Sequence, residues 1–254
     1  MLLRLLRRLA LLAAMGACVY LAYGYGRAIA ALTAAILLVI AGSLTIWLPR
    51  SAHKAFERGD YGRAALWYHA LRWTLLERAA RLSVEVSLAA CDVAREDFAR
   101  AMRRLDSVGP EQLGEAARSA WFNNRAYALA RDARDPADAL DCAQRAIDLR
   151  PQVPGFRHTR GIALLALNRV DDAIRELDAV WSALDGADAP PLLEAERCYD
   201  LAIAWRRKGE RDYARDYFER AQRAAPDSPW AIRAAEELGD RREPAGHAVL
   251  PELV

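Results

Sequence analysis

The side chains that most often carry out chemistry are few and scattered in this chain of 254 residues. A zinc site would show histidines at H-E-x-x-H spacing or cysteines in C-x-x-C pairs, because a metal needs several ligands on one face. Neither pattern is present. The four histidines and four cysteines are His53, His69, His158, His247, Cys18, Cys91, Cys142 and Cys198. We therefore expect no metal site and no disulfide framework, with the cysteines of the later segments acting as small apolar fillers.

Motifs for nucleotide binding and for acyl transfer are absent as well. The chain contains no G-x-G-x-x-G or G-x-x-x-x-G-K-[ST] loop and no G-x-S-x-G nucleophile turn. Neighbouring carboxylates occur at Asp171 and Asp172 and at Glu236 and Glu237. The pattern around them predicts exposed helix faces, where carboxylates are simply solvated. The sequence thus predicts a protein that is not an enzyme and that binds no cofactor.

Charge is divided unevenly along the chain. The chain has 36 basic and 34 acidic residues, but its first 50 residues contain five arginines and no acidic residue. The remainder therefore holds 31 basic and 34 acidic residues. A nearly neutral body of mixed charge is typical of a solvated surface and does not favour nucleic-acid binding, which needs a basic patch.

Two long uncharged stretches lie within the first 50 residues. Eighteen residues separate Arg8 from Arg27, and twenty-two separate Arg27 from Arg50. A helix needs about 20 apolar residues to cross a bilayer. The Gly-Tyr-Gly sequence before Arg27 permits a reversal, so we expect a transmembrane helical hairpin with helices at about 9–25 and 28–48. Tyrosines at the turn and a tryptophan near the second end agree, because aromatic rings favour membrane interfaces.

Basic residues flank the two ends of the predicted hairpin. They are Arg4, Arg7 and Arg8 before it and Arg50, Lys54, Arg58 and Arg63 after it. Because basic loops stay on the cytoplasmic side, we expect both ends and the rest of the chain in the cytoplasm, at the inner membrane in a bacterium. Two alternatives stay open. Residues 1–25 could be a cleaved signal peptide or, with Cys18, a lipoprotein signal, and the rest of the chain could lie outside the cytoplasm.

A sparse pattern of small residues recurs along the rest of the chain. In one copy Gly209, Ala214, Phe218 and Ala221 follow one another at spacings of five, four and three. The key alanines of the copies are Ala64, Ala101, Ala139, Ala173 and Ala214. Twelve residues earlier, or thirteen in the third copy, stand Ala52, Ala89, Ala126, Gly161 and Ala202. Such paired small residues let two helices approach closely, so each copy predicts a helix-turn-helix unit.

This pattern resembles the tetratricopeptide repeat (TPR), whose unit is 34 residues long. The gaps between the key alanines are 37, 38, 34 and 41 residues. The resemblance implies an all-α, right-handed solenoid of about five repeats over residues 51–238, including a capping helix near 229–238. A loosely ordered tail is expected at 239–254. Because Ala52 already belongs to the first repeat helix, the second membrane helix is expected to run into the repeats.

Within these units we expect two local features. Gly161 is expected to face Ala173 across one helix pair, since only small residues permit the close approach. Gly59, Asn168 and Gly209 are expected to adopt the left-handed conformation that ends the first helix of a pair.

The resemblance also implies a groove for a protein partner, lined by the first helices of successive repeats. The positions carried over are Val86, Tyr127, His158, Ile162, Leu165, Tyr199, Ile203, Arg206 and Arg207. An apolar groove with tyrosines and two arginines at one end suits an amphipathic helix or an extended segment. The lysine and asparagine clamp of TPR co-chaperones is absent. The alternative is that Val86, Ile162 and Ile203 are buried between helices.

These expectations combine into one hypothesis for function. The protein is expected to be a membrane-anchored TPR scaffold or adaptor that mediates protein–protein interaction in the assembly of a membrane-associated complex. Its partners would be a protein and the lipid bilayer, and not nucleic acid. The alternative is a structural subunit whose hairpin packs into a larger membrane complex while the repeats act as a spacer.

Overall fold

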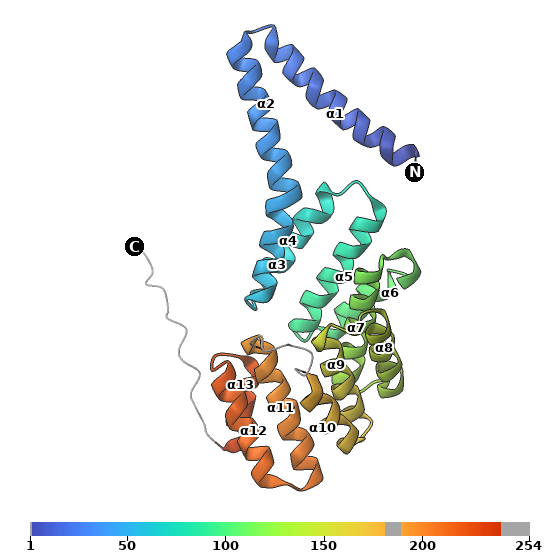
Figure 1. The fold of residues 1–254 in the computed structure, drawn as a ribbon, viewed down its shortest axis with the longest axis vertical. Helices are drawn as coiled ribbons and strands as arrows, with labels where there is room; N and C mark the ends of the chain where they lie inside the picture. The colour runs from blue at the N-terminus through green and yellow to red at the C-terminus, as the bar shows by residue number, and fades with distance from the viewer. Residues whose placement is uncertain (1, 181–188, 240–254) are drawn as a thin grey trace, which may run out of the picture. The chain divides into compact units, whose positions relative to one another are not determined.

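The computed structural model describes residues 2–180 and 189–239, with side chains from residue 12 onward (Figure 1). Within these ranges all regular structure is helical, as expected from the alanine-rich periodic sequence. The chain divides into two compact units, residues 1–114 and 115–254. The predicted tail at 239–254 lies outside the described residues apart from Gly239.

The first unit begins with two helices joined by a tight turn. Helix α1 spans Leu2–Tyr23 and α2 spans Arg27–Gly42. Gly26, between them, has a φ of 125°, a backbone conformation that residues with a Cβ atom rarely adopt. The reversal therefore falls at the Gly-Tyr-Gly sequence, as predicted.

Helix α2 does not end at the repeats but continues into them. A π-helical turn, η1 (Ser43–Trp47), joins it to α3 (Leu48–Glu57). Together they form one helix of 31 residues, Arg27–Glu57. Its most apolar part is long and apolar enough to cross a membrane, and only 6% of that part is buried. Where side chains are described, from residue 12 onward, no second helix meets this test, and Leu12–Tyr23 of α1 counts as a shorter apolar helix.

Two helix pairs complete the first unit. Helix α3 pairs with α4 (Tyr61–Thr74), and α5 (Arg78–Ala94) pairs with α6 (Phe98–Asp106). A short 3-10 turn, η2 (Pro110–Gln112), follows. The small residues that the pattern singled out, Ala52, Ala64, Ala89 and Ala101, are all 0% exposed.

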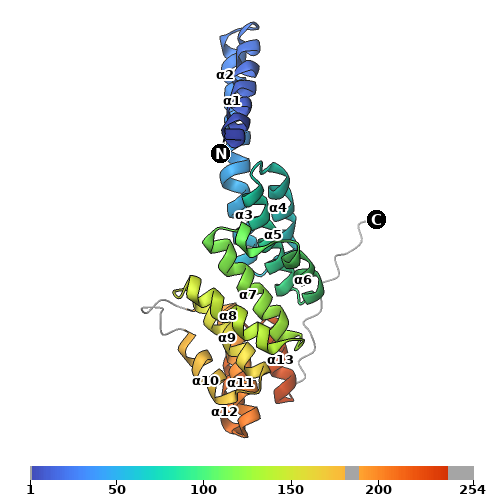
Figure 2. The ribbon, with the colours of Figure 1, turned by 90° about the vertical axis from the view of Figure 1, so that its right-hand side faces the viewer.

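Over its described residues, 115–180 and 189–239, the second unit contains three further pairs and a closing helix (Figure 2). They are α7 (Glu115–Arg131), α8 (Pro136–Leu149), α9 (Pro154–Ala166), α10 (Val170–Asp178), α11 (Pro191–Lys208), α12 (Arg211–Ala224) and α13 (Pro229–Leu238). Within this unit α7 contacts α9, α9 contacts α11, and α11 contacts α13. The first helices of successive pairs therefore form a continuous layer.

The turn inside each pair has the same backbone signature. Gly59, Asn168 and Gly209 have positive φ values of 77°, 57° and 92°, as predicted from their residue types. Glu96 and Ala133 take the corresponding place in the other two pairs, with φ of 60° and 51°. The left-handed position is thus a property of the repeat, and two pairs use residues that do not favour it.

The space beside Gly161 is filled by a residue of α10. A Cβ at Gly161 would lie 2.7 Å from Cδ2 and Cγ of Leu177. Leu177 stands one turn after Ala173, the residue expected to face Gly161, and both are 0% exposed. The glycine therefore makes room for the large Leu177 side chain.

Candidate functional site

A buried polar network connects three first helices of the second unit. Arg131, at the end of α7, donates from Nη1 to Oδ1 of Asp200 over 2.7 Å and from Nη2 to its Oδ2 over 2.8 Å. The same Nη2 donates to Oε1 of Glu196 over 2.7 Å. Glu196 and Asp200 are one turn apart on α11, so both carboxylates face the same side of that helix. One guanidinium thus contacts two carboxylates.

Two further side chains complete the network. His158, from α9, places Nε2 3.0 Å from Oδ2 of Asp200. The Tyr127 hydroxyl donates to Oε1 of Glu196. Tyr127 and Arg131 are also one turn apart, on α7. The side chains of His158 and Asp200 are only 2% and 1% exposed, so this network lies inside the layer of first helices.

Aromatic rings cover the guanidinium of Arg131. Its Cζ lies 5.1 Å from the centroid of the Tyr127 ring and 4.7 Å from that of Trp230, on α13. At these distances a cation is attracted by the electron-rich face of the ring. Tyr199 lies beside Trp230, with ring centroids 5.5 Å apart. The network therefore extends from α7 to the closing helix.

The surroundings fix the charge of the network members. Burial would raise the pKa of Asp200, but Arg131 and the hydrogen bond from His158 outweigh it and lower the pKa below its usual value. Burial is the main reason why the pKa of the Tyr127 hydroxyl is raised well above its usual range. At neutral pH Asp200 is therefore ionised, and Tyr127 is a neutral donor.

His158, Glu196 and Asp200 could also be considered as metal ligands, since their donor atoms lie within 4.8 Å of one another. The guanidinium of Arg131 already contacts both carboxylates and supplies their counter-charge. A divalent ion would have to displace it. The donor set thus fits a compensated ionic network better than a metal centre.

The predicted groove residues fall into two groups. Val86, His158, Ile162 and Leu165 are buried, with 2%, 2%, 3% and 5% of their surfaces exposed. They contribute to helix packing and do not form an open surface, because they face neighbouring helices. For Val86 and Ile162 this is the alternative stated above. Val86 moreover belongs to the first unit, whereas the other groove residues belong to the second.

The remaining groove residues are more accessible. Tyr127, Tyr199 and Ile203 are half-buried, while Arg206 and Arg207 are exposed. Arg206 pairs with Glu237 of α13, and Arg207 donates to the backbone oxygen of Leu165 over 2.6 Å.

A pocket of about 790 Å³ opens beside Arg206, between the end of α11, α12 and α13. Phe218 and Leu238 supply apolar lining, and Arg215 and Glu219 supply charge. Arg206 is the one predicted groove residue among the residues that line this pocket. The surface beside Arg206 is therefore concave and of mixed polarity.

No protein-family model and no curated protein matches the chain. Solved structures do. The chain is similar to TTC0263, a thermophilic TPR protein of Thermus thermophilus, with a TM-score of 0.54 and 19% identity over 74% of this chain and 96% of that one. MamA (TM-score 0.41, 17% identity, 80% and 100% coverage) and YrrB, a TPR protein with an unusual peptide-binding site (0.41, 19%, 73% and 88%), are more distant. The chain has a TPR-like fold.

Proposed function

We propose that the protein is a membrane-anchored scaffold that binds a protein partner through its TPR-like helix pairs and catalyses no reaction. One observation carries the anchoring part of the proposal. The apolar, largely unburied stretch of the Arg27–Glu57 helix continues without a break into the first helix pair. Burying such a surface in a bilayer is favourable, whereas leaving it in water is not.

The partner-binding part rests on the accessible end of the groove. Tyr199, Ile203, Arg206 and Arg207 lie on one helix, at intervals that keep most of them on one side of α11. Tyrosine and arginine are the residue types most often found at the centre of protein interfaces. The adjoining pocket could accept a side chain of an amphipathic helix or of an extended segment.

Crosslinking and affinity capture from membranes test this proposal with the full-length chain. A Tyr199→Ala, Arg206→Ala variant should lose partners that the unaltered protein captures, since both contacts would be truncated. Arg223→Ala is the matched control, because Arg223 is exposed on α12 and does not line the pocket. Equal capture by both variants, with circular dichroism showing intact helices, would exclude this surface as the partner site.

A hairpin exchange separates the scaffold from the alternative of a structural subunit. Residues 1–42 are replaced by an unrelated pair of membrane helices, and captured proteins are compared. A scaffold should keep its partner, because recognition lies in the repeats. A subunit held by its hairpin should lose its complex.

A further inference from the structure

We propose that the end of helix α4 lies in the membrane interface, where Trp73 and Leu76 enter the boundary between lipid headgroups and acyl chains. The inference rests on the proposed membrane anchor. The inference goes beyond that anchor, because it assigns a separate lipid contact to the first helix pair. The ligand is the surface of a bilayer that contains anionic lipids.

The packing of α3 against α4 sets the height of these residues along the membrane helix. Ala55 shares a cluster with Ala64, and Leu48 shares the next cluster with Leu71. Moving seven residues along α4, from Ala64 to Leu71, thus moves the contact seven residues back along the Arg27–Glu57 helix, from Ala55 to Leu48. The two helices run in opposite directions and stay in contact up to the start of α3.

A pair of aromatic rings also joins the two helices. Trp47, the last residue of η1, packs edge-on against Trp67 of α4, with ring centroids 5.2 Å apart. Helix α4 continues for nearly two more turns beyond Trp67. Continuing the pairing brings Trp73 to the level of Ile46, which lies inside the apolar stretch. The end of α4 must then reach the membrane if α2 crosses it.

Trp73, near the end of α4, and Leu76, in the connection that follows it, are large apolar side chains exposed to solvent. Trp73 is 86% exposed and Leu76 is 47% exposed, while Trp47 beside them is 55% exposed. Most other large exposed apolar side chains among the described residues belong to α1, α2 and η1. Tryptophan is enriched at membrane interfaces because its ring is apolar and its N–H is polar.

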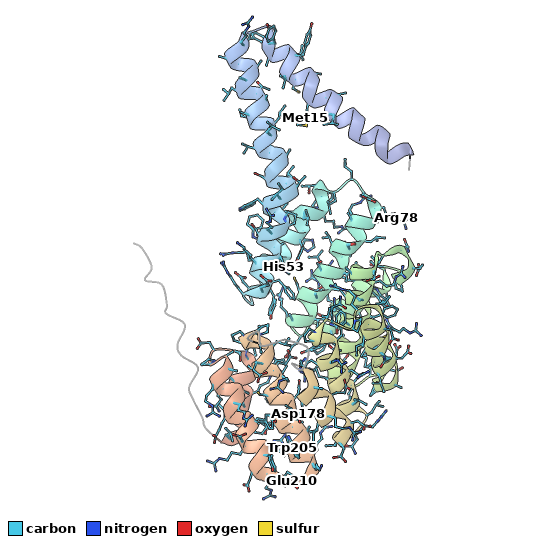
Figure 3. All side chains as sticks on the ribbon, viewed as in Figure 1. Met15, His53, Arg78, Asp178, Trp205 and Glu210 are labelled. Carbon is cyan, nitrogen blue, oxygen red and sulfur yellow. The ribbon has the colours of Figure 1, made fainter. Side chains whose placement is uncertain are left out.

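The charges around this patch suit anionic headgroups. Arg50, Arg78 and Arg81 are exposed near it, and Arg78 is labelled at the start of α5 in Figure 3. One carboxylate, Glu77, stands directly after Leu76 as the N-cap residue of α5. Glu85, the first acidic residue within α5, is engaged by Arg72 at 2.8 Å and by Arg104 at 2.9 Å. Exposed arginines next to a membrane helix are attracted by the negative surface potential of anionic lipids.

Fluorescence quenching from within the lipid tests the proposal on the full-length protein. An environment-sensitive thiol probe is attached to Trp73→Cys in a Cys18→Ser background, in vesicles of mixed phosphatidylcholine and phosphatidylglycerol. The native thiols Cys91, Cys142 and Cys198 are buried, and burial raises their pKa to about 12, so they stay protonated and unlabelled at neutral pH. A quencher on the lipid acyl chain should dim the probe at position 73.

Two matched positions make the result specific. Leu66→Cys lies seven residues earlier on the same side of α4 and is similarly exposed, at 63%, but it stands about two turns farther from the membrane. Ile36→Cys, 51% exposed in the middle of α2, reports on the anchor itself. We expect strong quenching at position 36, clear quenching at position 73 and little at position 66.

Each of the other possible outcomes would refute either the interfacial contact of α4 or the membrane anchor. Quenching at position 36 with a water-exposed probe at position 73 would refute the interfacial contact and leave the anchor standing. A probe at position 73 shielded from both water-borne and lipid-borne quenchers would mean that protein covers the patch, which also refutes the lipid contact. Absence of quenching at position 36 would refute the membrane anchor on which both ideas rest.

Discussion

Among single side chains, Arg131 has the largest expected effect on stability. It is the cation that compensates Glu196 and Asp200, whose side chains are 13% and 1% exposed. Arg131→Met keeps much of the volume but leaves two buried carboxylates without a counter-charge. Breaking one side of a buried ion pair costs about 3–5 kcal/mol, which should appear in the free energy of unfolding by urea. Arg134→Met is the control, because that side chain is 62% exposed and should change little.

Asp200 should make stability depend on acid pH. The pKa of Asp200 is lowered in the folded protein, so folding stabilises the ionised carboxylate relative to the unfolded chain. The resulting stabilisation is complete above the unfolded pKa of about 3.9 and is lost as pH falls through the lowered folded pKa. Urea unfolding measured across this acid range should show a decline that Asp200→Asn reduces. If the free energy of unfolding of Asp200→Asn declined at acid pH as steeply as that of the unaltered protein, Asp200 would not be the source of this pH dependence.

Gly161 should tolerate no side chain, because Leu177 fills the space beside it. A Cβ would approach two Leu177 carbons at 2.7 Å, and Leu177 is fully buried. Gly161→Ala should therefore lower the free energy of unfolding by about 1–3 kcal/mol through overpacking. Gly155→Ala, on the same helix but with no atom within 4 Å of the added Cβ, should be neutral or slightly stabilising. Equal melting temperatures for the two variants would refute this packing.

The sequence predicted some members of the buried network but not the network. Tyr127 and His158 were expected in a groove, on the resemblance to TPR proteins alone. Arg131 and Asp200 stand 69 residues apart, and no local pattern connects them. The i, i+4 pairs Tyr127–Arg131 and Glu196–Asp200 were the available signal, since each places two polar side chains on one helix face. Which faces meet depends on tertiary packing.

Whole helices were more predictable than contacts, because small residues must be buried wherever two helices approach closely. The key alanines Ala64, Ala101, Ala139 and Ala173 are all 0% exposed on α4, α6, α8 and α10. The left-handed turns at Gly59, Asn168 and Gly209 followed from residue type. Those at Glu96 and Ala133 did not, because these residue types disfavour positive φ. The repeat geometry outweighs local preference at these two positions.

The positive φ shared by the turns can be tested by exchanging alanine and glycine at two of them. Ala133 is exposed with a φ of 51°, so Ala133→Gly should relieve backbone strain and raise the unfolding free energy by up to about 1 kcal/mol. Gly209 has a φ of 92° at the equivalent place, so Gly209→Ala should lower it by about 1 kcal/mol or more. Thermal melting of both variants checks the opposite signs. Shifts in the same direction would contradict a shared turn.

For the molecule as a whole, the small-residue pattern predicts a repeat array over 51–238. The chain divides into two compact units, residues 1–114 and 115–254, so α1, α2 and the first two helix pairs belong to one unit. Gly109, Pro110 and Gly114 interrupt the chain between α6 and α7. Helical spacing alone does not show where such an interruption separates compact units, because the small-residue pattern continues on both sides.

The charges of the chain predict the direction in which the proposed hairpin would cross a membrane. Three arginines lie near the start of α1 and further basic residues follow η1, whereas Arg27, the first residue of α2, is the basic residue next to the turn between α1 and α2. Positive charge stays on the cytoplasmic side, so a reporter fused after Val254 should be active in the cytoplasm, and one inserted at Tyr25 on the opposite side. Peptides from residues 1–25 should persist in protein extracted from membranes. Their loss, together with a Val254 reporter active only outside the cytoplasm, would instead establish a cleaved signal peptide and an external repeat region.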